Sequence, residues 1–131
     1  MDNIIEVIKS RKTLFTLEGA TELEIKLAEE ELGVKFAQDY WELLSVYGVV
    51  SYEGHELVGI CSSPRLNVID VTIDERDKNP KVPMGMYVIE VTNIDLIVIW
   101  QSVNGEIYKT SMESEPVKLC DSLIEYVNIL V

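Results

Sequence analysis

The chain has 131 residues, 47% of them apolar and 26% charged, which is typical of a globular protein long enough to bury a core without disulfide or metal cross-links. Its 23 acidic and 11 basic residues give a formal net charge of −12, which repels nucleic acid and anionic membranes and favours basic partners. The length predicts a single domain over residues 1–131.

Targeting signals are not evident. The N-terminal segment lacks the basic start and long apolar core of a secretory signal. The longest apolar run, Ile94 to Trp100, is interrupted by Asp95 and is far shorter than the ~20 residues of a membrane span. Cys61 and Cys120 form no CxxC motif, so we expect free thiols in a reducing cytoplasm.

The N-terminal third has the periodicity of helices. Ile4, Ile5 and Ile8 predict a short helix within residues 3–12, and residues 13–19 are expected to form a linker. Thr21 followed by Glu24 fits a capping box that begins a second helix, which Gly33 should end.

Two faces are expected on this second helix. Its apolar rows predict the buried face: Leu23, Leu27, Ile25, Ala28 and Leu32. Its acidic residues predict the solvated face: Glu22, Glu29 and Glu30. A third helix, Asp39 to Tyr47, should follow, end at Gly48 and pack against the second.

After Gly48 the pattern indicates mostly strands. Residues 56–61 are predicted as a strand, whereas 64–79 are ambiguous because their β-branched residues favour a strand and their charged end favours a helix or loop. Residues 86–91, 94–101 and 106–110 predict an antiparallel meander with turns at Thr92-Asn93 and Asn104-Gly105, the latter of type I′. Its middle strand should be covered on both faces, and a helix from Leu123 to Leu130 should close the chain, capped by Asp121 or Ser122.

These residues together resemble the SUKH superfamily, which includes the yeast Smi/Knr cell-wall regulators and many bacterial immunity proteins. The resemblance lies in the order and spacing of Ile25, Ala28-Glu29, Leu32-Gly33, Asp39-Tyr40, Leu43-Leu44, Tyr47-Gly48, the segments 87–91 and 105–108, and the closing segment 122–126. In one departure, Ala37 stands where the family usually has a proline before the helix.

The resemblance implies an α+β fold in which helices pack around a central, mostly antiparallel sheet, and it favours a helix for residues 64–78. Similar bacterial proteins neutralise secreted toxins, often nucleases, by binding them. The family has no shared catalytic residues that could be carried over to this chain.

The residues themselves suggest little chemistry. His55 is the only histidine and lies between Glu53 and Glu56, but no serine or cysteine is placed as its nucleophile, and one histidine cannot form a multi-histidine metal site. A histidine in a loop or at a strand edge, able to act as a pH-sensitive contact, is the favoured interpretation. Four acidic residues, Asp70, Asp74, Glu75 and Asp77, lack EF-hand spacing and are better explained as a solvated helix end. We therefore expect no catalytic residue, cofactor or metal.

A partner-binding surface is the alternative to a catalytic site. Residues 18–56 contain ten acidic and two basic residues, an excess that could face a basic toxin. Among the aromatic residues, Trp100 is expected in the core, Tyr108 remains open, and Tyr52 in a polar loop is the better contact. The candidate partner-binding residues are Glu29, Glu30, Tyr52, Glu53, His55 and Glu56.

The leading hypothesis is a cytoplasmic immunity protein that neutralises a cognate toxin, encoded by a neighbouring gene, through stoichiometric binding. The alternative is a regulatory scaffold or sensor domain like the cell-wall regulators. A hydrolase using His55 is disfavoured, and the oligomeric state and the choice between active-site and adjacent binding stay open.

Overall fold

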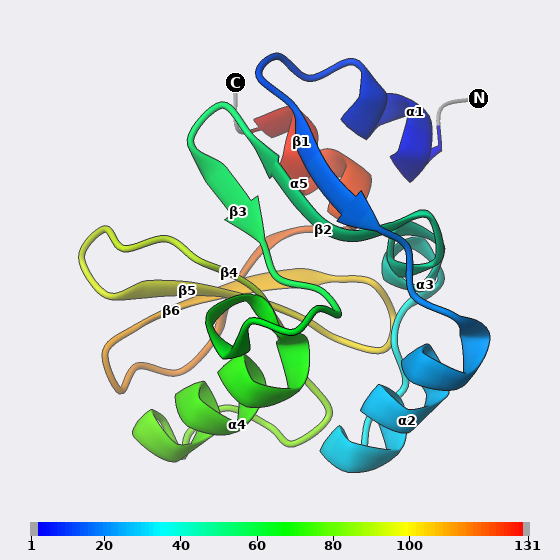
Figure 1. The fold of residues 1–131 in the computed structure, drawn as a ribbon. Helices are drawn as coiled ribbons and strands as arrows, with labels where there is room; N and C mark the ends of the chain where they lie inside the picture. The colour runs from blue at the N-terminus through cyan, green and yellow to red at the C-terminus, as the bar shows by residue number, and fades with distance from the viewer. Residues whose placement is uncertain (1–2, 130–131) are drawn as a thin grey trace.

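The computed structural model describes residues 3–129 and shows helices packed around two antiparallel sheets (Figure 1). The helices are α1 (Ile4–Lys9), α2 (Glu22–Leu32), α3 (Gln38–Val46), the 3-10 helix η1 (Pro64–Leu66), α4 (Val68–Lys78) and α5 (Leu123–Ile129). The strands are β1 (Phe15–Glu18), β2 (Tyr47–Tyr52), β3 (His55–Leu57), β4 (Tyr87–Val91), β5 (Ile97–Gln101), β6 (Ile107–Ser111) and β7 (Val117–Cys120). The predicted α+β class is confirmed.

The strands are ordered β1-β2-β3 in one sheet and β4-β5-β6-β7 in the other. The two sheets meet where the backbone N–H of Val58 donates to the carbonyl of Ile89 over 2.8 Å. Helix α4 packs on β4, and the Thr72 hydroxyl accepts a hydrogen bond from the N–H of Val88. Helices α1, α3 and α5 lie together on the other side of the molecule (Figure 1).

Strand β5 lies in the middle of its sheet, as predicted, with both faces covered. Val98, Ile99, Trp100 and Gln101 are all buried. The indole N–H of Trp100 donates to the Thr110 hydroxyl over 3.0 Å, so its polar atom is satisfied within the core. Trp100 is therefore a core residue, as expected.

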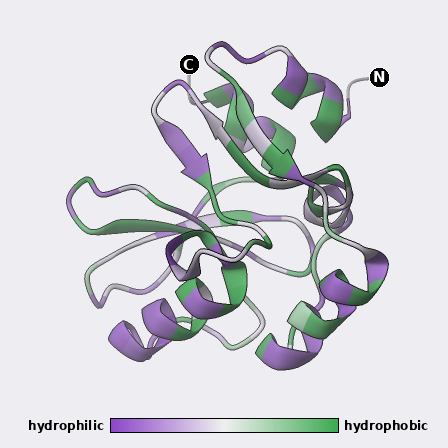
Figure 2. Cartoon of the chain, in the orientation of Figure 1, coloured by the Kyte–Doolittle hydropathy of each residue, from purple (hydrophilic) through white to green (hydrophobic). Residues whose placement is uncertain are grey.

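Helix α2 begins with the predicted capping box. The Thr21 hydroxyl accepts from the N–H of Glu24, whose carboxylate accepts from the N–H of Thr21, and Gly33 ends the helix at φ 67°. The predicted faces are partly wrong, because Leu23 and Leu27 are 67% and 50% exposed. Only the row through Ile25, Ala28, Glu29 and Leu32 meets the rest of the protein, so one side of the helix remains in solvent (Figure 2).

Gly48 does not end a helix, contrary to the prediction. The chain passes from α3 directly into β2, and Gly48 is the second residue of this strand. A Cβ atom there would lie 2.5 Å from the carbonyl oxygen of Glu18 and 2.8 Å from that of Ile60. The glycine is required because two backbones approach it closely.

Residues 68–78 are helical, in agreement with the family resemblance and against their β-branched composition. The Asn67 side chain caps α4 by accepting from the N–H of Ile69 over 2.9 Å. Val68, Val71 and Thr72 are buried against the sheet, whereas Asp70, Asp74 and Asp77 are exposed, and the outer side of α4 is largely purple in Figure 2. Packing against β4 overrides the intrinsic preference of this segment.

Strands β1 and β7 were missed because their side chains carry no burial pattern. Phe15 in β1 and Val117 in β7 are 62% and 56% exposed. Each strand exists because its backbone pairs with a neighbour, β1 with β2 and β7 with β6. The predicted three-strand meander is thus a four-stranded sheet.

Both predicted turns differ in detail. The β4–β5 connection spans residues 92–96 rather than Thr92-Asn93 alone. At the β5–β6 turn the N–H of Gly105 donates to the carbonyl of Ser102, and Gly105 rather than Asn104 has positive φ. This is a three-residue loop with a glycine bulge, not a type I′ turn.

Other boundaries shift by a few residues. Helix α1 ends at Lys9, and β3 covers residues 55–57 instead of 56–61. Ser122 caps α5, since its hydroxyl accepts from the N–H of Glu125 over 3.1 Å. Leu130, the predicted end of this helix, lies outside the described residues.

A buried hydrogen-bond chain joins α3, the four-stranded sheet and α5. The Tyr87 hydroxyl accepts from the N–H of Ala37 over 2.8 Å and donates to the side-chain carbonyl of Gln101 over 2.7 Å. The Gln101 amide donates to one Asp39 oxygen, and the other accepts from the N–H of Leu123, both over 2.9 Å. Burial raises the pKa of Tyr87, which keeps its hydroxyl a proton donor.

Replacing Ala37 with proline tests this chain. Ala37 has φ −62°, which proline tolerates, so the substitution chiefly removes the N–H donor to Tyr87 and crowds its hydroxyl. We expect Ala37→Pro to lower the free energy of unfolding by about 1–2 kcal/mol in urea denaturation. In a Tyr87→Phe background, which has no acceptor, the same substitution should cost less than about 0.5 kcal/mol. Equal costs in both backgrounds would contradict the proposed role of this bond.

Candidate protein-binding site

His55 is part of a structural network rather than a catalytic pair. It lies half-buried in β3, and its Nδ1 is 3.2 Å from a carboxylate oxygen of Glu90, not of Glu53 or Glu56. Glu90 is 3% exposed and also accepts from the N–H of Glu56 and the hydroxyl of Tyr126. Burial, followed by the charge of Glu90, raises the pKa of Tyr126, so this hydroxyl stays protonated and donates. The network holds β3 and α5 to β4.

Two predicted contact residues lie in the interior. Tyr52 is fully buried in β2 instead of a polar loop, and burial raises its pKa. Glu29 is 8% exposed, and its carboxylate accepts from the N–H of Phe36 over 2.8 Å, so the expected solvated position is wrong.

Glu30 and Glu53 are exposed and lie on different elements, Glu30 on α2 and Glu53 in the β2–β3 turn. Glu53 has φ 46°, its N–H donates to the Thr13 hydroxyl, and its carboxylate accepts from the N–H of Lys12. Glu53 therefore connects the β2–β3 turn to the segment between α1 and β1.

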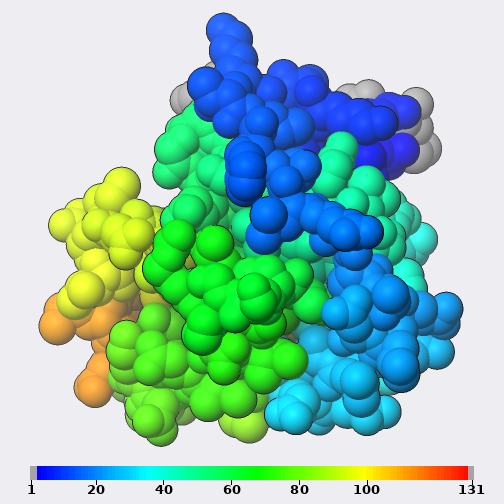
Figure 3. Space-filling view, viewed as in Figure 1, coloured from blue at the N-terminus to red at the C-terminus, as the bar shows by residue number. Residues whose placement is uncertain are grey.

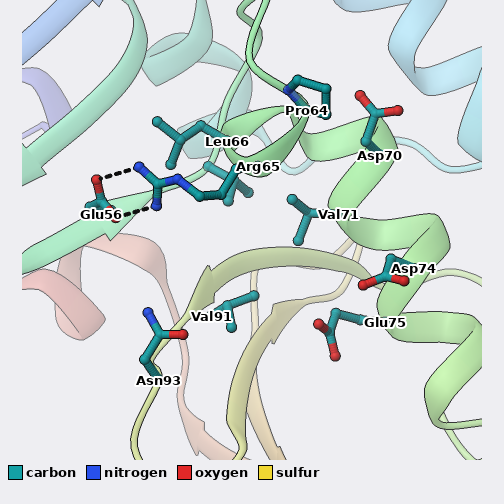
Figure 4. A pocket seen from close by; sticks show the side chains of 11 residues that line it. Glu56, Pro64, Arg65, Leu66, Asp70, Val71, Asp74, Glu75, Val91 and Asn93 are labelled. Carbon is teal, nitrogen blue, oxygen red and sulfur yellow. Dashed lines mark hydrogen bonds and ion pairs between the residues drawn. The ribbon is translucent and has the colours of Figure 1, made fainter.

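Glu56 points into a groove between β3, η1 and α4. Arg65 approaches it with both terminal guanidinium nitrogens, at 2.7 and 3.2 Å, and these hydrogen bonds lower the pKa of Glu56 (Figure 4). The pair has considerable solvent exposure, with side-chain exposures of 65% for Arg65 and 41% for Glu56. Its contribution to stability is accordingly small.

We call this hollow the acidic groove, and its volume is about 400 Å³. In Figure 4, Val71 and Val91 form its apolar floor, and the carboxylates of Glu56, Asp74 and Glu75 surround them. The residues that line it are Glu56, Val58, Pro64, Arg65, Leu66, Asp70, Val71, Asp74, Glu75, Val91 and Asn93. The groove thus combines an apolar floor with an acidic rim.

The charge of the groove is incompletely balanced. Lys78 is shared between Asp74, at 3.1 Å, and Glu75, at 3.6 Å, and Arg65 pairs with Glu56. Asp70 has no ion-pair partner among the described residues. A cleft lined by one sign of charge concentrates the electrostatic field, so the groove attracts basic side chains.

The predicted solvated helix position is confirmed for Asp70 and Asp74, whereas the Glu75 side chain is only 14% exposed, and none of the three was predicted as part of the binding surface. Helical spacing puts Asp70 and Asp74 one turn apart, a signal that becomes visible only once residues 68–78 are taken as a helix. Arg65 had no sequence signal, because its partner Glu56 belongs to a different element.

The rest of the described chain offers little else for chemistry. No three His, Cys, Asp or Glu side chains within residues 3–129 lie together in a way that would hold a metal ion. Cys61 and Cys120 are free, and burial raises the pKa of Cys120. None of the described helices combines the length and apolar character needed to cross a membrane.

Glu90→Gln tests the structural role of the His55 network. The amide would present a donor where the carboxylate now accepts from three donors, so we expect a loss of about 2 kcal/mol in the free energy of unfolding. The exposed Glu30→Gln is the control and should change it by less than about 0.5 kcal/mol. Chemical denaturation followed by circular dichroism measures the free energy of unfolding of both variants. If Glu90→Gln is as stable as the wild type, Glu90 is not a structural anchor.

Comparison with known proteins identifies the family of the chain. A search of curated proteins finds no match to the chain. The family model described as SMI1-KNR4 cell-wall, SUKH_5, matches residues 1–130. Since the match extends over nearly the whole sequence, the chain belongs to the SUKH_5 family of the SUKH superfamily.

Proposed function

We propose that this protein is an immunity protein that binds a cognate toxin domain stoichiometrically and blocks its activity. The observation that supports the proposal is the family-model match over residues 1–130. The SUKH superfamily, which the sequence also resembles, includes many bacterial immunity proteins. The absence of shared catalytic residues in this superfamily agrees with a binding role.

The acidic groove supplies a physical basis for toxin capture. A nuclease toxin carries basic side chains where it holds phosphate, and the carboxylates around Val71 and Val91 complement such a surface. The net charge of −12 steers the encounter, and close contacts in the groove then slow dissociation. Toxin inhibition would follow from covering the site that binds nucleic acid or from blocking access beside it.

A regulatory scaffold is the second candidate. It is favoured by the description of the matching family, which names SMI1-KNR4 cell-wall proteins. Both candidates bind another protein, so they differ in the partner. A toxin gene adjacent to the gene for this chain favours immunity, whereas an isolated locus favours regulation.

Co-expression tests the immunity proposal directly. The toxin encoded by the neighbouring gene should arrest growth alone, and growth should recover when this protein is produced with it, because the complex sequesters the toxin. Co-purification in equal amounts is the second measurement. Failure of both rescue and co-purification would reject the immunity function.

Neutralising the acidic groove tests the steering argument. Asp70→Asn with Asp74→Asn should reduce the association rate with the toxin several-fold at low ionic strength, and the difference should shrink as salt is added. Glu30→Gln with Glu31→Gln removes the same charge from the exposed face of α2 and is the matched control. An equally slow control would show that net charge, rather than the groove, accounts for steering.

A further inference from the structure

We propose that the acidic groove continues into an apolar recess, and that the two together bind one amphipathic segment of the partner, in which basic side chains flank a large apolar anchor. This inference rests on the proposed function in naming the toxin as the source of the segment.

The recess has a volume of about 600 Å³ and lies between the end of α4 and the ends of the β4–β5 and β6–β7 connections. Val98 and Trp100 of β5 form its buried wall, and Leu96 and Met112 form its open rim. Glu75, Val91 and Asn93 line both the recess and the acidic groove, so the two are continuous. In Figure 3 the yellow atoms of the β4–β5 connection stand apart from the green atoms of α4, with a hollow strip between them.

The rim presents apolar side chains to solvent. Leu96 is 66% exposed and Met112 is 69% exposed, although both stand beside a recess with buried apolar walls. An apolar recess of several hundred Å³ is in the size range of ligand pockets and accepts a large apolar side chain. Leu and Met at the rim supply an adaptable apolar contact for such an anchor.

The backbone holds these side chains in an unfavourable conformation. Leu96 and Met112 have φ of 59° and 55°, a left-handed region that bulky side chains rarely adopt. Hydrogen bonds maintain the β4–β5 connection in this shape, from the N–H of Thr92 to the carbonyl of Ile97 and from the N–H of Ile97 to that of Ile94. Strain of this kind is concentrated at binding sites, because it is retained where it positions a contact.

Charge identifies the kind of segment that fits. Glu113 borders the recess, while Asp70, Asp74, Glu75 and Glu56 border the groove, and the only cations among the residues that line the two are Arg65 and Lys78. Nucleic acid and acidic peptides are repelled by this rim. Lysine or arginine residues on either side of an apolar anchor match an acidic rim around an apolar recess, as in the binding of amphipathic helices in grooves.

Asparagine substitutions test the rim without unfolding the protein. Asn tolerates positive φ better than Leu or Met, so Leu96→Asn with Met112→Asn should maintain or raise thermal stability. The same double variant should weaken binding to the toxin domain encoded by the neighbouring gene about tenfold, mainly through faster dissociation. Surface plasmon resonance measures the rates, and scanning calorimetry measures the stability.

The matched control is Leu23→Asn with Met84→Asn. Each of these residues is 67% exposed, and neither lines the groove or the recess. The control should bind the toxin like the wild type. If the toxin binds the wild type and the Leu96/Met112 variant equally, the inference is overturned, while the proposed function stands.

A peptide probe separates the two proposals if the neighbouring product does not bind. A short synthetic helix of lysine and leucine should shift the backbone amide resonances of Leu96, Met112 and Asp74 saturably, because it has both basic and apolar side chains. A lysine–serine peptide of equal charge should not. Shifts from the first peptide alone would support the groove although the toxin function had failed, and no difference between the peptides would overturn the inference.

Discussion

The Tyr87 hydroxyl lies where the connection between α2 and α3, the four-stranded sheet and the closing helix meet. It accepts from Ala37 and donates to Gln101, which in turn reaches Asp39, the carboxylate that receives the first N–H of α5. Each of these side chains has hydrogen-bond partners, and a buried polar network stabilises a single arrangement only when its polar groups are paired. Because the N–H of Ala37 is used as a donor, alanine in place of the usual family proline is consistent with the fold of this chain.

This network and the Glu90 network lie on the opposite face of the four-stranded sheet from α4. Tyr87 and Glu90 point away from α4, whereas the side chain of Thr72 reaches from α4 to Val88 between them. These two side-chain networks fix the sheet from one side. On the other side α4 packs on β4, and its outer edge and the hairpin ends form the groove.

Much of the acidity that stands out in residues 18–56 has a structural role. Glu24 completes a capping box, Glu29 accepts from Phe36, and Asp39 belongs to the buried network. Glu56 is paired with Arg65. Among the described residues, Glu30 and Glu31 of α2 are exposed without an ion pair, as is Asp70 of α4, so the acidity of residues 18–56 is divided between structural and solvent-exposed carboxylates. Burial and pairing, which depend on distant residues, decide whether a carboxylate is available to a partner.

The sequence by itself determined the elements whose signals are local. The capping box at Thr21, the left-handed Gly33, the buried run around Trp100 and the order of elements shared with the SUKH superfamily are all confirmed. The pattern of residues 64–79 left helix and strand open, and the family resemblance favoured the helix that the structure shows at 68–78. Only the tertiary structure decided that β1 and β7 are strands and that Tyr52 and Glu29 are buried. It also brought Leu96 and Met112 beside α4 to form the candidate site. These features come from backbone pairing and from contacts between residues far apart in the chain, and such contacts leave no period in the sequence.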